Sequence, residues 1–363
     1  MPQWSGPEHG HTPPPARRTR GGPAIARVTI ADIAREAGLS KGAVSYALND
    51  KPGVSETTRT RVNEIALRLG WSASATARSL SRSRADAIGL VLVRPARMLG
   101  VEPFFMEFVA GIQSVLARGE LALSFLLVDS VEAEIRVYER WAAQGRVDGL
   151  ILVDISDDDP RVEVVRRLAI PTVFVSNADE DFDLPHVWTG EDQSMREAAQ
   201  YLIRLGHRRL ARVGGIPRFR HIAVRNRTLL EVAAEAGIPV PVVIDTDFSG
   251  EAGARATRKL LSLPEPPTAI VYDNDIMAVA GLGVAAELGI SVPRELSLLA
   301  WDDSALCEIT HPPLSAMHRD VIALGSTATQ LLLDLIETGE GRGVEGPRAT
   351  LYPRGSTGRP PAA

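Results

Sequence analysis

The chain has 363 residues, enough for two to three domains, and a formal net charge of −5 at pH 7. Its single cysteine, Cys307, excludes an intrachain disulfide and argues against a cysteine-based metal site. Residues 1–27 lack the apolar run of a secretory signal, and their Pro, Gly, His and Arg content predicts a disordered tail. No apolar run reaches the length of a bilayer span, so we expect a cytoplasmic protein that does not bind membranes.

Positive charge is concentrated near the start of the chain. Residues 1–84 hold 13 Lys and Arg against 6 Asp and Glu, a net charge of +7, which leaves −12 on the remainder of a chain of net charge −5. A basic head is attracted to phosphates, while an acidic body is repelled by them. A uniformly acidic enzyme would not show this division.

The first predicted element is a short helix that begins after Thr29. Thr29 can cap it, and Asp32 stands three residues later, where it can bond back to the cap. Gly38 ends the helix, because a residue just past a helix end often needs a positive φ. One apolar stripe at helical spacing faces inward and consists of Ile30, Ile33, Ala34 and Ala37.

A second helix begins after Ser40, its predicted cap. Two short helices joined by a tight glycine-containing turn form a helix-turn-helix, whose second helix enters the major groove of DNA. Lys41 can donate to guanine or to a phosphate, although a solvated surface lysine is an equally good interpretation. The other outward positions of the second helix are Gly42, Ser45 and Tyr46. We also expect Thr29 and Ser40, at the starts of the two helices, to contact DNA.

A third helix follows Ser55 and ends at Gly70, which completes a helix-turn-helix domain over residues 28–73. The stretch Ala77-Arg78-Ser79-Leu80 then falls in a segment, residues 74–85, that we interpret as a hinge helix and linker. Without the hinge, the apolar stripes would also fit a three-helix packing module that does not bind DNA.

The order of these motifs resembles the LacI/GalR family of bacterial transcriptional repressors. The matching features are the Val-Thr-Ile-x-Asp-Ile-Ala opening, the Gly-Leu-Ser turn, the Val-Ser pair of the second helix and the Ala-Arg-x-Leu hinge. The resemblance implies that Leu80 wedges into the minor groove and that Ala77 packs against a partner hinge; such a wedge costs a few kcal/mol of unstacking, which the wider contact offsets. Ser74 stands where the family usually has Asn, so capping of the hinge helix differs.

From residue 86 to 355, short apolar runs alternate with amphipathic helical patterns. This alternation predicts an α/β fold with parallel sheets covered by helices on both faces. The series divides near Val187–Glu191, and Leu314–Leu335 returns to the first half; Ser356–Ala363 looks like a loose tail. The expected strands are Ile88–Val93, Leu121–Val128, Gly149–Val153, Thr172–Val175, Leu210–Val213, Ala269–Tyr272 and Leu298–Trp301, and the expected helices are Phe105–Arg118, Val131–Gln144, Gln193–Leu205, Arg227–Ala236, Gly250–Leu263, Asp275–Leu288 and Ile322–Glu337.

These two halves resemble the two-lobed periplasmic-binding-protein-like core that the same family joins to its head. The resemblance is carried by Leu205-Gly206-His207-Arg208-Arg209, Asp273-Asn274-Asp275-Ile276-Met277-Ala278, Ala300-Trp301-Asp302-Asp303 and His311-Pro312-Pro313-Leu314-Ser315. His207, in a helix-to-strand turn, is expected to be structural.

Open α/β sheets bind ligands at the carboxyl ends of their strands, so the cleft between two such lobes is the expected pocket. Asn274 and Asp302 follow strand ends, and Arg225 lies in the loop and helix start after Gly214-Gly215. A carboxylate, an arginine and a carboxamide can satisfy neighbouring sugar hydroxyls. The resemblance implies effector contacts by Arg225, Asn274, Asp302 and an aromatic Phe248, and we add Phe104, Phe105, Ser176 and His221, with Ser176 standing where many relatives have Asp.

Each of these residues also has a structural interpretation. Arg225 can belong to a surface ion pair, Asn274 can be a turn residue, and Phe104 and Phe105 can be lobe packing. His221 can be a solvated loop histidine. Gly214-Gly215 lacks the rest of a phosphate-binding glycine motif.

We predict that the protein is a homodimeric transcriptional regulator, most often a repressor in such families. It is expected to bind a near-palindromic operator and to be controlled by a small molecule, with a sugar as the expected class. The alternatives are a solute-binding protein and a regulator with a non-sugar effector such as a purine. An enzyme on a doubly wound fold is disfavoured, because no nucleophile elbow, metal triad or phosphate loop is present. We expect no cofactor and no metal.

Overall fold

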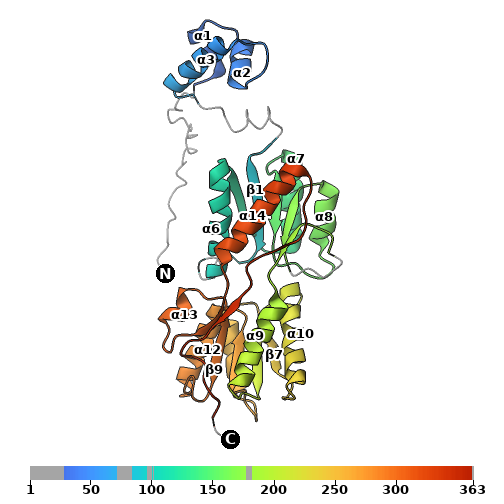
Figure 1. Ribbon diagram of the computed structural model, residues 1–363, viewed down its shortest axis with the longest axis vertical. Helices are drawn as coiled ribbons and strands as arrows, with labels where there is room; N and C mark the ends of the chain where they lie inside the picture. Colours follow the sequence, from blue (N-terminus) through green and yellow to red (C-terminus); the bar gives the residue numbers. More distant parts are fainter. Residues whose placement is uncertain (1–27, 72–83, 96–99, 101, 177–181, 362–363) are drawn as a thin grey trace, which may run out of the picture. The chain divides into compact units, whose positions relative to one another are not determined.

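The protein is described here from a computed structural model, in which residues 28–71, 84–95, 100, 102–176 and 182–361 are described. The chain divides into two units, residues 1–83 and residues 84–363. The first unit carries helices α1 (Ile30–Ala37), α2 (Lys41–Leu48) and α3 (Glu56–Arg68). Figure 1 shows these three helices packed together.

The head folds around the stripes that the sequence predicts. Ile33, Val44, Val62 and their neighbours form one buried cluster between the three helices. The Asp32 carboxylate accepts hydrogen bonds from the backbone N–H and the hydroxyl of Thr29, at 3.0 and 2.7 Å. Gly38 ends α1 with φ 68°, and the Ser40 hydroxyl caps α2 by accepting from the Ala43 N–H at 3.1 Å. The predicted helix-turn-helix is confirmed.

The second unit consists of two lobes, each built on a six-stranded sheet. The first sheet has the strand order β11-β5-β4-β3-β1-β2 and the second β12-β10-β9-β8-β6-β7. Adjacent strands are parallel, with the exception of β10 and β12. The predicted α/β fold with parallel sheets is confirmed.

The elements of the first lobe are β1 (Ala87–Val93), α6 (Pro103–Leu116), η1 (Ala117–Gly119), β2 (Ala122–Val128), α7 (Val131–Gln144), β3 (Gly149–Leu152), α8 (Pro160–Leu168), β4 (Thr172–Val175), β5 (His186–Trp188), α14 (Val321–Thr338) and β11 (Val344–Glu345). Helices α6 and α14 cover one face of the sheet and α7 and α8 the other (Figure 1), which gives two apolar clusters on either side of it.

The elements of the second lobe are α9 (Glu191–Arg204), β6 (Leu210–Gly214), α10 (Arg220–Glu235), β7 (Val242–Asp245), α11 (Gly250–Leu261), β8 (Ala269–Tyr272), α12 (Asp275–Glu287), β9 (Ser297–Trp301), α13 (Ala305–Ile309), β10 (Ser315–His318) and β12 (Thr350–Tyr352). Here α11 and α12 share one apolar cluster with the sheet, and α9 and α10 share the other.

The chain passes between the lobes three times, after β5, after β10 and after β11. The first passage falls at the predicted division near Val187–Glu191. The return of the chain is also as predicted, because α14 packs on the first sheet although β10 belongs to the second. These crossings bring Thr189, Glu191 and Arg319 to the junction between the lobes.

Two expectations about the bounds of elements in the core need correction. Helix α10 begins at Arg220 rather than Arg227, so His221 and Arg225 lie within its first two turns and not in a loop. The tail is not loose at its start, since Ser356 is fully buried and its hydroxyl bonds to the Leu298 carbonyl and to the Ser315 N–H. Gly358 also accepts a hydrogen bond from the His207 ring, which confirms the structural role expected for that buried histidine.

Among the described helices, α14 is long and apolar enough to cross a membrane by length and composition alone. The expectation that no segment reaches that measure is therefore wrong for α14. The helix instead contributes Leu324, Ala328 and Leu332 to the apolar cluster beneath the first sheet. This packing gives α14 a place in the core of the lobe.

Candidate functional site

The outer face of α2 in the head is accessible. Lys41 and Gly42 are exposed, Tyr46 is 47% exposed, and Ser45 is half-buried. A side chain at Gly42 would meet only the Ser40 hydroxyl, at 3.8 Å, so the backbone can be approached closely there. Thr29 and Ser40 are exposed at the starts of α1 and α2.

Three cations of the head have no acidic partner among its described residues. Arg35, Arg59 and Arg68 form ion pairs within the head. Lys41, Lys51 and Arg61 are exposed and form no ion pair within the described part of the chain. Exposed unpaired cations beside a helix-turn-helix are available to phosphates. The hinge predictions for Ala77 and Leu80 lie outside the described residues.

The core holds a cavity at the carboxyl ends of the strands, between its two lobes. It has about 710 Å³ of empty volume, part of which is open solvent. All eight residues predicted from the sequence line it: Phe104, Phe105, Ser176, His221, Arg225, Phe248, Asn274 and Asp302. The strand-end rule thus brings side chains from both lobes to one place.

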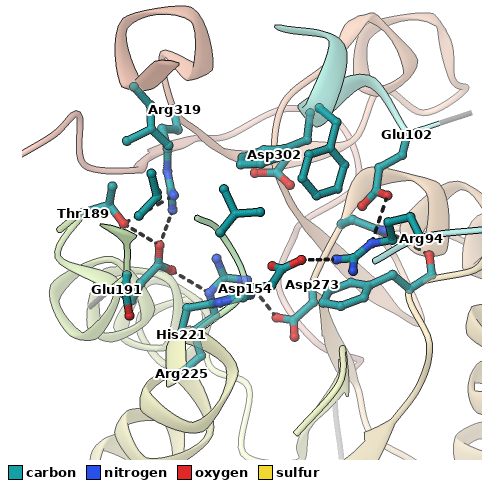
Figure 2. Close-up of a pocket in the computed structure, with 18 residues that line it drawn as sticks. Arg94, Glu102, Asp154, Thr189, Glu191, His221, Arg225, Asp273, Asp302 and Arg319 are labelled. Carbon is teal, nitrogen blue, oxygen red and sulfur yellow. Dashed lines mark hydrogen bonds and ion pairs between the residues drawn. The ribbon is translucent and has the colours of Figure 1, made fainter. Parts of the chain in front are cut away.

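Arg225 forms the centre of a buried ionic network (Figure 2). Its Nε donates to Glu191 at 2.6 Å, its Nη1 donates to Asp273 at 3.3 Å, and its guanidinium lies 4.0 Å from the centre of the Trp301 ring. Burial opposes ionisation of Glu191, but the Arg225 and Arg319 guanidinium groups overcome it and hold the pKa of Glu191 well below its ordinary value. The alternative of a surface ion pair is wrong, because Arg225 is only 5% exposed.

Asn274 has the structural role that the sequence left open. Its Oδ1 accepts from the Met277 N–H at 2.8 Å, which caps α12, and its Nδ2 donates to the Phe248 carbonyl at 2.9 Å. Both polar atoms are therefore engaged by the protein, although the residue also lines the cavity. Its part in ligand binding would be to fix the wall.

Arg94, at the end of β1, reaches into a cluster of aromatic rings. Its guanidinium carbon lies 5.2 Å from the Phe105 ring of the first lobe and 5.7 and 5.6 Å from the Phe219 and Phe248 rings of the second. These distances are within the range of cation–π attraction. Arg94 also pairs with Asp154 of its own lobe at 2.7 Å, while its contacts with Phe219 and Phe248 join the two lobes across the cavity.

Two acidic side chains in the cavity differ from the others. Glu102 is 7% exposed, and its nearest cation is the Arg94 Nε at 3.9 Å, beyond hydrogen-bond reach. Burial raises the pKa of Glu102 and the pKa of Asp302 to about 7, although Arg94 and Arg319 respectively oppose the shift. Burial, with the charge of Arg225, also lowers the pKa of His221 to about 4. His221 is thus neutral at pH 7, whereas Glu102 and Asp302 are partly protonated.

Backbone strain gathers at the same place. Asp154, Phe248 and Asp302 line the cavity with φ of 56°, 67° and 64°, in the left-handed region that non-glycine residues avoid. Each such residue costs of order 1–3 kcal/mol and persists where its surroundings fix it. Strain of this kind is concentrated at functional sites.

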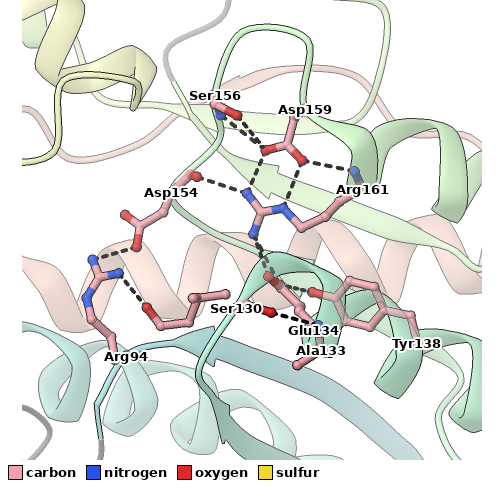
Figure 3. A network of polar contacts seen from close by, with 10 residues as sticks. Arg94, Ser130, Ala133, Glu134, Tyr138, Asp154, Ser156, Asp159 and Arg161 are labelled. Atoms are coloured by element: carbon pink, nitrogen blue, oxygen red, sulfur yellow. Dashed lines mark hydrogen bonds and ion pairs between the residues drawn. The ribbon is translucent and has the colours of Figure 1, made fainter.

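Contacts from two sides fix Asp154 (Figure 3). Arg94 holds its carboxylate, and Arg161 Nη2 donates to its carbonyl at 2.9 Å. Arg161 is itself buried and pairs with Asp159 at 2.7 Å and Glu134 at 3.1 Å. The network thus connects the cavity to α7 and α8 of the first lobe.

Several lining residues were missed in the sequence: Arg94, Glu102, Asp154, Thr189, Glu191, Asp273 and Arg319. Arg94, Asp154 and Asp273 follow strands that were predicted, so the strand-end rule would have found them, whereas Arg319 follows β10, which the sequence did not predict. Among the described residues, no group of three His, Cys, Asp or Glu side chains could hold a metal ion.

The fold and the cavity define a class, a two-lobed ligand-binding core joined to a helix-turn-helix head. Residues 29–74 match the model of bacterial regulatory proteins of the lacI family, and residues 199–357 match the periplasmic binding protein-like domain. The HTH-type transcriptional regulator AglR of Rhizobium meliloti (strain 1021) is 30% identical over 344 residues, covering 92% of this chain and 95% of that protein.

Two solved structures are also similar. A complex of the transcriptional regulator CelR with cellobiose has a TM-score of 0.70 and 27% identity, and the match covers 91% of this chain and all of that chain. The lac repressor dimer bound to operator and an anti-inducer has a TM-score of 0.80 at 24% identity, with 92% and 99% covered, and shows the shared fold. The chain belongs to the lacI family of bacterial regulatory proteins.

Proposed function

We propose that the protein is a homodimeric repressor that binds a near-palindromic operator and is released or engaged by a sugar in the cavity between its lobes. The observation that carries the proposal is that one chain combines an accessible α2 with a cavity lined by charged side chains and strained backbone. Two heads on a dimer would read two half-sites of the operator. The protein is proposed to act in the cytoplasm, at DNA, and not as an enzyme.

The head residues proposed to contact DNA are Thr29, Ser40, Lys41, Gly42, Ser45, Tyr46, Ala77 and Leu80. Lys41 is free for a phosphate or a guanine, and Gly42 permits the backbone to approach a base pair. Phosphate contacts supply affinity, and base contacts with the Leu80 wedge supply specificity.

The cavity suits a polyhydroxylated ligand. Arg94 Nε, Arg319 Nε and Glu102 Oε2 are buried atoms with no hydrogen-bond partner among the described residues. Sugar hydroxyls both donate and accept, so one sugar can satisfy donors and acceptors of this kind. The complex of the similar regulator CelR with cellobiose supports this choice of ligand class.

Control of DNA binding follows from thermodynamic linkage. A ligand shifts operator affinity only by its differential affinity for the two arrangements of the lobes. Side chains from both lobes line the cavity, so a ligand that contacts both discriminates between those arrangements.

The test is fluorescence anisotropy of the purified protein with DNA from upstream of its own gene, in moderate salt and with excess unrelated DNA. Specific binding that a sugar changes is expected. Leu80→Ala should weaken specific binding much more than non-specific binding, whereas Leu67→Ala, on α3 and 84% exposed, should change neither. Sequence-blind association would refute the operator, and an equal loss of both kinds of binding would refute the wedge.

A further inference from the structure

The cavity holds more acidic charge than its cations neutralise. Glu191 binds Arg225 and Arg319, Asp273 binds Arg212 and Arg225, and Asp154 binds Arg94. These three carboxylates face four guanidinium groups, so with Glu102 and Asp302 ionised the excess is one negative charge. This leaves Glu102 and Asp302 without a hydrogen-bonded cation among the described residues.

Glu102 is a buried carboxyl in the cavity wall that lacks a hydrogen-bond partner at one of its oxygens. It is 7% exposed, it lines the cavity, and its Oε2 accepts no hydrogen bond from any described residue. A buried carboxylate that accepts no hydrogen bond is costly in free energy, so it either takes up a proton or binds a cation. Its pKa of about 7 fits a carboxyl in that position.

Asp302 stands between this cavity and a second one. The second cavity is also lined by Phe104, Asp302 and Arg319 of the first, and its further acidic side chains are Glu107, Asp275, Asp303 and Asp320. Arg354 neutralises Asp303 at 2.6 Å. The remaining carboxyls give the approach to Asp302 a negative potential, which concentrates cations.

The aromatic rings provide an independent indication. Three rings already surround the guanidinium of Arg94 at 5.2 to 5.7 Å, from both lobes. Aromatic faces attract cations most strongly where water is excluded. The rings at the cavity thus already stabilise one cation, Arg94, which shows that positive charge is accommodated beside them.

We propose that the effector carries a positive charge, as a hydroxylated ligand with a protonated amine of the amino sugar class, held by the carboxylates of Glu102 and Asp302. The proposal deepens the proposed function and rests on it. Its ammonium group would supply the cation that Glu102 and Asp302 lack, and its hydroxyls would engage the orphaned guanidinium atoms of Arg94 and Arg319.

The test compares ligands that share one carbon skeleton and differ in charge. Glucosamine, galactosamine and mannosamine are each titrated into the full chain at pH 7 beside the parent hexose, the N-acetylated form and the uronate. At least one amine is expected to bind tenfold or more tightly than its neutral counterparts, and its uronate not at all. If no amine binds better than its neutral counterparts, or a uronate binds best, the proposal is wrong.

Variants locate the charge. Glu102→Gln and Asp302→Asn should each lower the affinity for the amine tenfold or more, and by a larger factor than they lower the affinity for the parent hexose. Glu265→Gln, at an exposed position outside the cavity, is the matched control and should keep the preference. An unchanged preference in both cavity variants would overturn the assignment.

Operator release separates the two proposals. If a neutral or anionic sugar binds and changes operator affinity while the amines do not, the proposed function holds and the charge proposal fails. If no ligand of any charge changes the affinity of an operator-binding protein, the effector part of the proposed function fails.

Discussion

At the residue scale, the cavity wall depends on charges that cannot be removed singly. Arg225 and Asp273 are 5% and 2% exposed, and each has two ionic partners. Removing one member of a buried ion pair leaves the other charge uncompensated in a region of low dielectric, at a typical cost of about 3–5 kcal/mol. A residue that lines the cavity thus also stabilises the fold of its lobe.

We expect Arg225→Met to lower the free energy of unfolding by about 1.5–3 kcal/mol, because Glu191 and Asp273 each lose a charged hydrogen-bond donor although they keep Arg319 and Arg212. Arg255→Met on α11 is the control, since its partner Glu251 is 85% exposed and the pair is screened by water. That change should cost less than about 1 kcal/mol. Urea unfolding measures both, and equal losses would show that the Arg225 network adds no stability.

The eight effector residues proposed from the sequence all line the cavity, some predicted from the carboxyl ends of strands, as for Ser176, Asn274 and Asp302, and others, as for Phe248, implied by the family resemblance. The roles of individual residues were less predictable. Gly215 shows why: a Cβ there would lie 2.0 Å from the Phe248 ring, so the glycine makes room for a side chain 33 positions later in the sequence. Contacts over such separations depend on the fold and not on a local pattern.

At the element scale, α6 and α14 cross at unusually close range. A Cβ at Gly111 would lie 2.1 Å from the Ile322 carbonyl oxygen, and one at Gly325 would lie 2.3 Å from that of Phe108. These contacts are with backbone, which cannot rotate away as a side chain can. The two glycines therefore set the distance between the helices.

Gly111→Ala should force α6 and α14 apart and destabilise the core by roughly 1–3 kcal/mol, the usual cost of overpacking. Gly283→Ala on α12 is the matched control, because its Cβ would meet nothing within 4 Å. There alanine should stabilise by about 0.5–1 kcal/mol through its helix propensity. Thermal unfolding of both variants decides the matter, and a stabilising Gly111→Ala would contradict the close crossing.

Elements with strong local signals were predicted well, and α7, β4 and β8 have the expected bounds. Those missed have short or mixed patterns: β5 has three residues, β10 reads Ser-Ala-Met-His, and β7 is a partly exposed edge strand. The predicted helix at α10 began seven residues too late. The first two turns of α10 include the polar residues Arg220, His221 and Arg225, which interrupt the apolar spacing that marks a helix. Tertiary pairing supplied the order that local propensity lacked.

At the scale of the whole molecule, the chain separates its charges by task. The head carries exposed unpaired cations, whereas the cavity of the core carries carboxyls that lack a hydrogen-bonded cation among the described residues. The positive charge of the head could be predicted from the sequence, because counting charged residues by region is enough to find it. Such a count could not predict the carboxyls of the cavity, because Glu102 and Asp302 are 200 positions apart and only the two lobes bring them to one cavity.

These carboxyls make the stability of the core depend on pH. Glu102 and Asp302 have folded-state pKa values of about 7, above their ordinary values of 4.5 and 3.8. The folded state thus holds more protons than the unfolded state between about pH 4 and 7, and stability is lost as the pH rises through 7. His221 acts in the opposite sense, because its folded pKa of about 4 costs stability as the pH falls below 6.5.

We therefore expect the free energy of unfolding to fall between pH 5 and 7.5, most steeply near pH 6 to 6.5, because His221 opposes the fall at lower pH and the carboxyls have lost most of their excess protons above pH 7. The double change Glu102→Gln with Asp302→Asn should make the free energy of unfolding less dependent on pH over this range. The full pKa shift of Glu102 alone corresponds to about 3 kcal/mol, which its replacement by Gln should restore at pH 7.5. Urea unfolding followed by the fluorescence of buried Trp141 and Trp301 measures it, with Glu265→Gln as the control. If the unfolding free energy of the double variant depends on pH as steeply as that of the parent, these two carboxyls have ordinary pKa values in the folded protein.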